Sequence, residues 1–202
     1  MNYLSTILKF MPIALMGILT LGTYWMVQLG TPDNLPNKSK KHVPDYTLDE
    51  VTITTLGPSG ETKYRIVGTK LTHYEDDSSS TLTNPLARRF HPTKPPTTVK
   101  ADIGLMNGEM SILNLNGNAT LTRPAQPASA SDSGSARLFM SSASFTILLN
   151  EDIVKTNLPV TLEQGLSIMS SEEGAVFDNV HQQLTMVGKV RGRIESDTKK
   201  GY

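Results

Sequence analysis

The 202-residue chain lacks cysteine, has few aromatic residues (6%) and carries no net charge, because 19 Lys and Arg balance 19 Asp and Glu. The absence of cysteine excludes disulfides, thiol chemistry and Cys-based metal sites. A net charge of zero argues against the basic surface of a nucleic-acid-binding protein. Helical periodicity is missing outside the N-terminus, whereas Gly, Ser, Thr and Asn are plentiful. This composition favours short strands and turns.

The familiar patterns of catalytic and metal-binding residues are also missing. The chain has four histidines, His42, His73, His91 and His181. None lies at metal-ligand spacing from another, and there is no HExxH motif. The carboxylate run at 75–77 lacks the EF-hand spacing, so we interpret it as a solvated turn. GPSGE at 57–61 does not have the spacing of a nucleophile elbow. We therefore expect no catalytic residue, no metal and no cofactor.

The one long apolar run is FMPIALMGILTLGTYWMVQL at residues 10–29, with no charge between Lys9 and Asp33. About 20 apolar residues suffice to cross the hydrocarbon core of a bilayer as a helix. Tyr24 and Trp25 lie towards its far end, where amphipathic rings favour the membrane interface. A cleaved signal peptide and a buried core helix are the alternatives. Thr20-Leu21-Gly22 is a poor cleavage site, which favours an uncleaved membrane anchor.

The sequence divides into five segments around this run. We predict an N-terminal stretch at 1–9, a transmembrane helix at 10–29, a polar and Pro-bearing linker at 30–44, a β domain at 45–195 and a polar tail at 196–202. The orientation is not fixed by charge, because only Lys9 precedes the span while three lysines follow it.

From Asp45 onwards, apolar and polar residues alternate in short stretches, which predicts strands. The stretches are 51–55, 63–68, 71–74, 81–83, 113–121, 145–149 and 158–162. The phase of alternation slips at Leu113, which suggests a β-bulge or a change of strand there. We interpret 87–96 and 124–136 as loops. Many short strands at this spacing indicate an all-β sandwich, jelly roll or barrel.

The last strand is predicted in LTMVGKVRGRI, residues 184–194, where Leu184, Met186, Gly188, Val190 and Ile194 share one face. A strand at the end of a chain often lies at an open sheet edge, which recruits other strands. Upstream, Gly174 is expected to mark a tight turn whose replacement by a bulky residue damages the fold.

Strand phase also assigns residues to the inner face of the domain. The inward candidates are Ile53, Tyr64, Ile66, Leu71, Leu82, Leu115, Leu121, Phe145, Ile147, Val160, Leu162, Phe177, Leu184 and Met186. Phase alone does not distinguish a closed core from an apolar groove.

Several stretches in order resemble the LptC family of lipopolysaccharide-transport proteins. They are PDYTLDEVTITTLGPSGETKYRIVGTKLTHYEDDSSSTLTNP at 44–85, VKADIG at 99–104, LNGNATLTR at 115–123, LPVTLEQG at 158–165 and VGKVRGRIE at 187–195. The short N-terminal anchor also fits this family. The low-complexity stretch at 124–136 departs from its compact pattern.

The resemblance implies an all-β, open and twisted β-jelly roll in the periplasm, held to the inner membrane by the single helix, with residues 1–9 in the cytoplasm. It implies no enzyme activity. Such a protein receives lipopolysaccharide from an ATP-driven LptF/LptG/LptB transporter and passes it to LptA by edge-to-edge contact. The inward candidates would then line a lipid groove.

The resemblance also assigns the two edges to partners. The transporter side would comprise Tyr46, Leu48, Val51, Thr52, Ile53 and Thr54. The LptA side would comprise Val187, Gly188, Lys189, Val190, Arg191, Gly192, Arg193 and Ile194. One alternative is a membrane-anchored structural subunit of an envelope or secretion assembly with a filled core. Another is a hydrolase that uses His73, Glu75 and Asp76.

Overall fold

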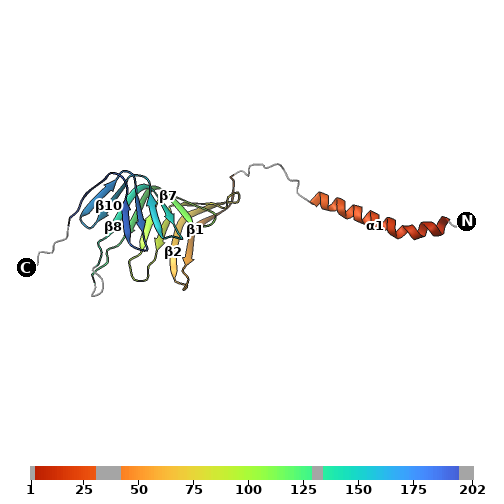
Figure 1. The fold of residues 1–202 in the computed structure, drawn as a ribbon, viewed down its shortest axis with the longest axis horizontal. Coiled ribbons are helices and arrows are strands. Elements are labelled where there is room, and N and C mark those ends of the chain that lie inside the picture. The colour runs from red at the N-terminus through yellow and green to blue at the C-terminus, as the bar shows by residue number, and fades with distance from the viewer. Residues whose placement is uncertain (1–2, 31–41, 129–133, 196–202) are drawn as a thin grey trace, which may run out of the picture. The chain divides into compact units, whose positions relative to one another are not determined.

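The computed structural model describes residues 3–30, 42–128 and 134–195. Parts of the predicted N-terminal stretch, linker, 124–136 loop and tail, namely 1–2, 31–41, 129–133 and 196–202, lie outside the described residues. The chain separates into two units, Met1–Lys41 and His42–Tyr202. The first holds a helix and the second holds every strand (Figure 1).

Helix α1 runs from Tyr3 to Gly30, and its segment Met11–Leu29 is long and apolar enough to cross a membrane. Nineteen residues at about 1.5 Å each reach about 28 Å, close to the thickness of a bilayer core. The hydroxyls of Thr20 and Thr23 donate to the carbonyls of Met16 and Leu19 at 2.9 and 3.0 Å, so they need no water.

The second unit contains 14 strands, and every neighbouring pair is antiparallel. Four strands are long: β1 (Pro44–Leu56), β2 (Thr62–Tyr74), β7 (Ile112–Arg123) and β8 (Leu138–Leu148). The others are short: β3 (Ser80–Thr83), β4 (Leu86–Arg89), β5 (Thr97–Lys100), β6 (Ile103–Met106), β9 (Ile153–Thr156), β10 (Val160–Gln164), β11 (Ser167–Ser171), β12 (Ala175–Asp178), β13 (Gln183–Met186) and β14 (Val190–Arg193).

The 14 strands form one hydrogen-bonded sheet that folds over on itself, and we call its two layers, which share the four long strands, sheet I and sheet II. In sheet I the order is β1-β2-β4-β5-β7-β8-β10-β11-β14. In sheet II the order is β1-β2-β3-β6-β7-β8-β9-β12-β13. Strand β2, for example, pairs with β4 through Tyr64–Val67 and with β3 through Lys70–His73. Each short strand of sheet I therefore has a counterpart in sheet II.

We call the line where the chain passes between the sheets the crease. It comprises residues 50, 68–69, 84–85, 101–102, 117–118, 143, 157–159, 172–174 and 187–189. In β7, residues 117–118 oppose Ala143 of β8 alone, which is a β-bulge that bends the strand. Hydrogen bonds also run along the crease, from the Asn84 N–H to the Asp102 carbonyl (2.8 Å) and from the Asp102 N–H to the Gly117 carbonyl (3.0 Å).

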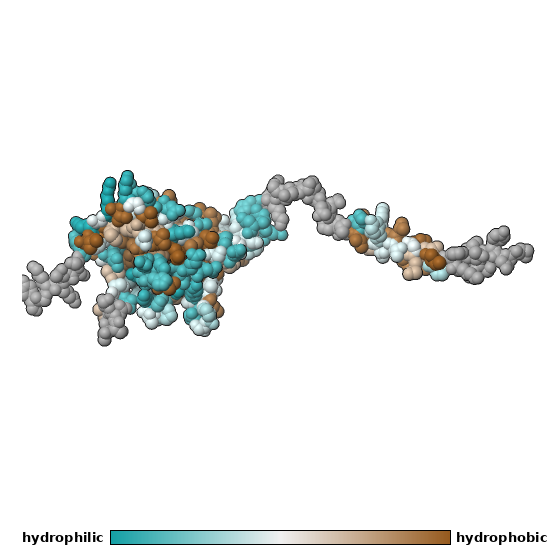
Figure 2. All heavy atoms as spheres, in the orientation of Figure 1, coloured by the Kyte–Doolittle hydropathy of each residue, from teal (hydrophilic) through white to brown (hydrophobic). Residues whose placement is uncertain are grey.

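A single cluster of buried apolar side chains fills the space between the sheets. It draws on both sheets, for instance Ile66 and Leu162 from sheet I and Leu82 and Leu113 from sheet II, all at most 1% exposed. Full burial of each such side chain stabilises the fold by about 1.5–3 kcal/mol. The visible face of the domain is mostly polar, with apolar patches between the polar residues (Figure 2).

The predicted fold class, an all-β jelly roll after one apolar helix, is confirmed, but three details are wrong. Stretches 63–68 and 71–74 form one strand, β2. The predicted loop at 87–96 begins inside strand β4. At Leu113 the alternative of a change of strand fits, because β7 begins at Ile112 after the turn at 107–111; the bulge of β7 lies further on, at 117–118. The third detail concerns the last strand.

The single strand predicted over 184–194 is two strands. Strand β13 pairs with β12 in sheet II, and β14 pairs with β11 in sheet I. Gly188 lies between them with a φ of +84°, a backbone conformation that ends an extended strand. Regular alternation on both sides of the glycine gave the appearance of one strand, whereas the chain crosses the crease there.

Candidate functional site

All the predicted inward residues lie in the cluster between the sheets or pack against it. Tyr64, Ile66, Leu71, Leu82, Leu115, Leu121, Phe145, Ile147, Val160, Leu162 and Phe177 are buried, whereas Ile53, Leu184 and Met186 are half-buried at its margin. A small void in the interior is lined by residues of both sheets, including Ala87 and Val154. The interior is therefore apolar and largely filled by side chains.

Sequence reasoning missed the part of this cluster that comes from the shortest strands. Ala87 in β4, Val99 in β5 and Met106 in β6 are 2 to 3% exposed. A four-residue strand shows only two alternations, too few to establish a period.

The strand ends opposite the crease form the mouth of the sandwich, and a polar cluster joins the two sheets there. Asp152 precedes β9 of sheet II and is 6% exposed. Arg89 at the end of β4 donates to both its carboxylate oxygens, at 2.9 and 3.1 Å. The Tyr64 hydroxyl also donates to Asp152 Oδ1, and Lys63 Nζ lies 3.5 Å from Asp152 Oδ2. Two residues of β2 and one of β4 thus hold one carboxylate of the facing sheet.

The electrostatics of this mouth cluster favour a charged Asp152. Burial opposes its ionisation, but hydrogen bonds from Arg89 and Tyr64 and the charges of Arg89 and Lys63 outweigh burial, so the pKa of Asp152 lies below its usual value of 3.8. Burial, and then the hydrogen bond to Asp152, raise the pKa of Tyr64, which stays protonated as a donor. A neighbouring contact extends the mouth, where the buried Thr97 hydroxyl donates to Asn179 Oδ1 at 2.8 Å.

The sandwich ends in open edges on both sides. Within the described ranges, β1 pairs with β2 alone, and β13 and β14 each pair with one neighbour. Figure 1 shows β1 and β10, which is close to the other edge, on opposite sides of the domain.

The predicted edge residues lie on these strands or in the turn between them. Tyr46 and Leu48 of β1 are exposed, whereas Val51 and Ile53 are half-buried. The second predicted edge covers the turn at 187–189, all of β14 and Ile194, which is 78% exposed.

Gly174 connects β11 of sheet I to β12 of sheet II. Its φ is +117°, and a Cβ there would lie 2.0 Å from the Thr156 carbonyl oxygen. The N–H of Val187 donates to the Gly174 carbonyl at 2.9 Å, which ties this crossing to the crossing at the C-terminal edge. Only glycine fits this position.

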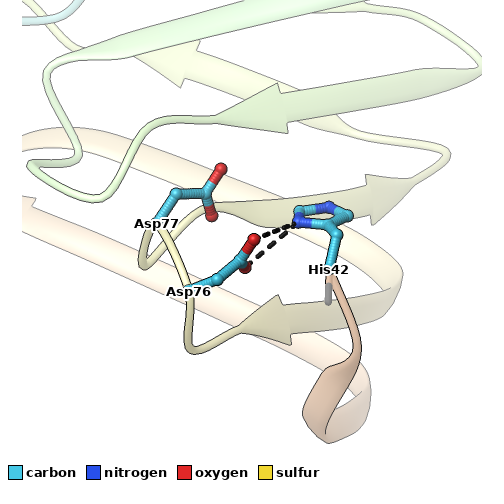
Figure 3. Close-up of side chains that lie close together, drawn as sticks. All are labelled: His42, Asp76 and Asp77. Carbon is cyan, nitrogen blue, oxygen red and sulfur yellow. Dashed lines mark hydrogen bonds and ion pairs between the residues drawn. The ribbon is translucent and has the colours of Figure 1, made fainter. Parts of the chain in front are cut away.

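A polar group also forms where β1 meets the turn after β2. His42 Nδ1 lies 3.0 Å from Asp76 Oδ2, and Asp77 is close by (Figure 3). The His42 ring stacks on Tyr74 at 3.7 Å. Sequence spacing missed this approach, because the residues come from segments far apart in the chain. His42 and Asp77 are exposed. The contacts of His42 fasten the residues just before β1 to the end of β2 and the turn after it, whereas Asp77 accepts a hydrogen bond from the Ser79 N–H at 2.9 Å within its own turn.

His73 fastens the same end of β1. Its Nδ1 lies 2.8 Å from Asp45 Oδ1, and its ring stacks on Tyr46 at 4.6 Å. The hydrolase alternative groups His73 with Glu75 and Asp76, but the Asp76 carboxylate contacts His42 and His73 contacts Asp45.

These features define a class of protein: an antiparallel β-jelly roll with an apolar interior and two open edges, preceded by one helix of membrane-spanning length. The family model of LptC-related lipopolysaccharide-assembly proteins matches residues 13–195. The chain therefore belongs to this family. None of the curated proteins compared with it matches in sequence.

Among solved structures, the chain is similar to LptH of Pseudomonas aeruginosa, described as the LptA-homologous periplasmic component of the lipopolysaccharide transport device. The TM-score is 0.50 at 8% identity, over 66% of this chain and 95% of that chain. At this identity the likeness shows the fold alone. Family membership supports a role in lipopolysaccharide transport as a transport or structural component. With α1, it supports single-pass anchoring and a periplasmic β domain.

Proposed function

We propose that the chain receives lipopolysaccharide from an LptF/LptG/LptB transporter in the inner membrane, holds its acyl chains between the two sheets and passes it to LptA. The observation that carries this proposal is the pair of open edges at opposite ends of one apolar interior. An added strand at an open edge forms backbone hydrogen bonds, so a second jelly roll extends the sandwich and its interior together.

The interior suits acyl chains by its chemistry. Each CH₂ group transferred from water gains about 0.8 kcal/mol. Because side chains such as Phe145 and Phe177 now fill the space, the sheets must separate for lipid to enter. An apolar interior with few fixed polar contacts lets a chain slide, which suits transfer better than tight binding does. No catalytic residue is needed, since ATP hydrolysis belongs to the transporter.

The two edges take different partners in this proposal. The edge of β1, with Tyr46, Leu48, Val51, Thr52, Ile53 and Thr54, faces the transporter. The edge of 187–194 faces LptA. Gly174 supports the second edge through its hydrogen bond with Val187.

Photo-crosslinking in living cells tests the proposal, with one crosslinking residue at each position from 184 to 194. Leu184 and Met186 point towards the interior and are expected to capture lipopolysaccharide, whereas the exposed Thr185 between them is not. Positions in β14 are expected to capture a periplasmic protein. Ile103, an apolar residue of β6 that is 48% exposed, is the matched control for non-specific capture. Capture of neither lipid nor protein at 184–194 contradicts the proposal.

A second candidate is a membrane-anchored structural subunit with a permanently closed core. The filled interior favours it. Lipid co-purification separates the two candidates, because a closed core retains no lipopolysaccharide while the edges still bind protein.

A further inference from the structure

Arg123 is a buried cation that has no counter-charge among the described residues. The residue ends β7 at the mouth and is 8% exposed. Its Nε is buried with no hydrogen-bond partner among the described residues, the one such side-chain atom in that part of the chain. No described carboxylate forms an ion pair with it. Burial lowers the pKa of its guanidinium, because nothing nearby compensates the charge.

The guanidinium lies between the apolar interior and a polar cavity. Its Cζ is 5.8 Å from the centre of the Phe177 ring, which belongs to the cluster between the sheets. The cavity has a volume of about 270 Å³, far more than one water molecule needs, roughly 30 Å³. Its polar lining comprises Lys94, Arg123, Gln126, Ser135, Gln164 and Gln182. Two cations and four hydroxyl or amide groups therefore surround a space lined by no described carboxylate.

Both sheets contribute to this lining. Arg123 and Gln164 end strands of sheet I. Gln182 lies in the turn between β12 and β13 of sheet II, where its Nε2 donates to the Asn179 carbonyl. The cavity therefore lies at the mouth, next to the space that acyl chains would occupy.

An unpaired buried charge is costly, and such exceptions in a folded protein call for a partner. The partner of a guanidinium is typically a carboxylate or a phosphate, which accepts two parallel hydrogen bonds. A phosphate also accepts hydrogen bonds from amides and hydroxyls, the other groups of this lining.

We propose that this cavity binds the phosphate of a lipid headgroup whose acyl chains lie between the sheets. The inference rests on the proposed lipid transport and adds to it a fixed polar contact at the mouth. Arg123 binds the phosphate, Lys94 adds a second charge from the β4–β5 loop, and the Phe177 ring beneath Arg123 marks the boundary between headgroup and acyl chains.

The test compares two lipids on the full-length protein in detergent: bisphosphorylated lipid A and the same lipid with both phosphates removed. Three proteins are compared, namely wild type, Arg123→Met and Arg65→Gln. Methionine keeps an unbranched apolar stem on Phe177 while removing the charge. Arg65 is the matched control, because it also lies over an aromatic ring (5.7 Å from the centre of Phe90) but is exposed and is not part of the cavity lining. Inorganic phosphate is added as a competitor.

The expected result is that Arg123→Met weakens binding of the phosphorylated lipid at least about tenfold, as losing a charged hydrogen bond does. Its affinity for the phosphate-free lipid stays unchanged, and Arg65→Gln matches wild type. Arg123→Met is also expected to keep or raise the Tm, which a purely structural arginine would not do.

Three results overturn the inference. If wild type binds both lipids equally, lipid binding stands and the phosphate site does not exist. If neither lipid binds, the proposed function fails as well. If inorganic phosphate binds with the same dependence on Arg123 and the lipid does not displace it, the site takes free phosphate and not a headgroup.

Discussion

Replacement of Asp152 by asparagine tests whether the mouth cluster holds the two sheets together. The Asp152 side chain is 8% exposed, and its main partner Arg89 is 16% exposed. Asparagine keeps the shape but has no charge and only one acceptor oxygen, so Arg89 loses its two-point partner. A buried charged hydrogen bond contributes roughly 1.5–3 kcal/mol, and the more exposed Lys63 adds less than about 1 kcal/mol.

We therefore expect Asp152→Asn to lower the free energy of unfolding by about 3 kcal/mol. For a domain of this size, that corresponds to a fall in Tm of roughly 6–12 °C. Chemical denaturation measures the loss. When Arg89 is already replaced by methionine, Asp152→Asn is expected to lower the free energy of unfolding by at least about 1 kcal/mol less than it does in wild type, since the two residues share one interaction.

A labelling experiment asks whether the mouth opens. The chain contains no cysteine, so a single Val154→Cys variant reports one interior position that is 6% exposed and lines the void between the sheets. Asp152→Asn is expected to increase its rate of reaction with a maleimide, while a cysteine at the exposed Ile103 reacts at the same rate in both backgrounds. An unchanged rate at position 154, or a stability loss below about 1 kcal/mol, would refute the reasoning.

Three further predictions follow from burial and backbone geometry. Gly174→Ala is expected to lower the free energy of unfolding by more than about 2 kcal/mol, because the new Cβ meets the Thr156 carbonyl. Gly60→Ala is the comparison, because Gly60 also has a positive φ but lies in open space, and it is expected to lower the free energy by less. Thermal unfolding measures both variants. Leu115→Ala, at a fully buried site, is expected to lower the free energy of unfolding by about 2–5 kcal/mol in chemical denaturation. Ile103→Ala, on the surface, is expected to change it by no more than about 0.5 kcal/mol. Because folding lowers the pKa of Asp152, its carboxylate stabilises the fold above about pH 3.8, and this stabilisation is lost as the pH falls further. When the free energy of unfolding is measured between about pH 2 and 6, it is therefore expected to fall less steeply with acid in Asp152→Asn than in wild type.

The inner face of the domain was predictable because burial follows strand phase. In β7, Leu113, Leu115 and Leu121 are buried and Asn114 is exposed, as alternation requires. The apolar run of α1 was equally clear, since length and lack of charge are properties of the sequence alone.

The mouth and the crease were not predictable in the same way. Arg89 and Tyr64 meet Asp152 from 63 and 88 positions away, so no local pattern marks them. Gly188 has the alternation of a continuous strand around it, and only its left-handed backbone shows that the chain changes sheet. Arg123 lies two positions after Leu121, in phase with the inner face, but a cation at the end of a strand is commonly solvated, so its burial is seen only in the structure.

The crease has a mechanical consequence. Because the long strands run through both sheets, the domain is one ribbon folded lengthwise, and widening its interior requires bending at the fold line without breaking the hydrogen-bonded ladders on either side. At the C-terminal edge, β13 is the last strand of sheet II and β14 is the last strand of sheet I. A neighbouring domain that pairs with both β13 and β14 would take up the same angle between its own two sheets. Spreading one domain would then spread the next, so that a row of such ribbons transmits an opening motion along its length as well as a lipid.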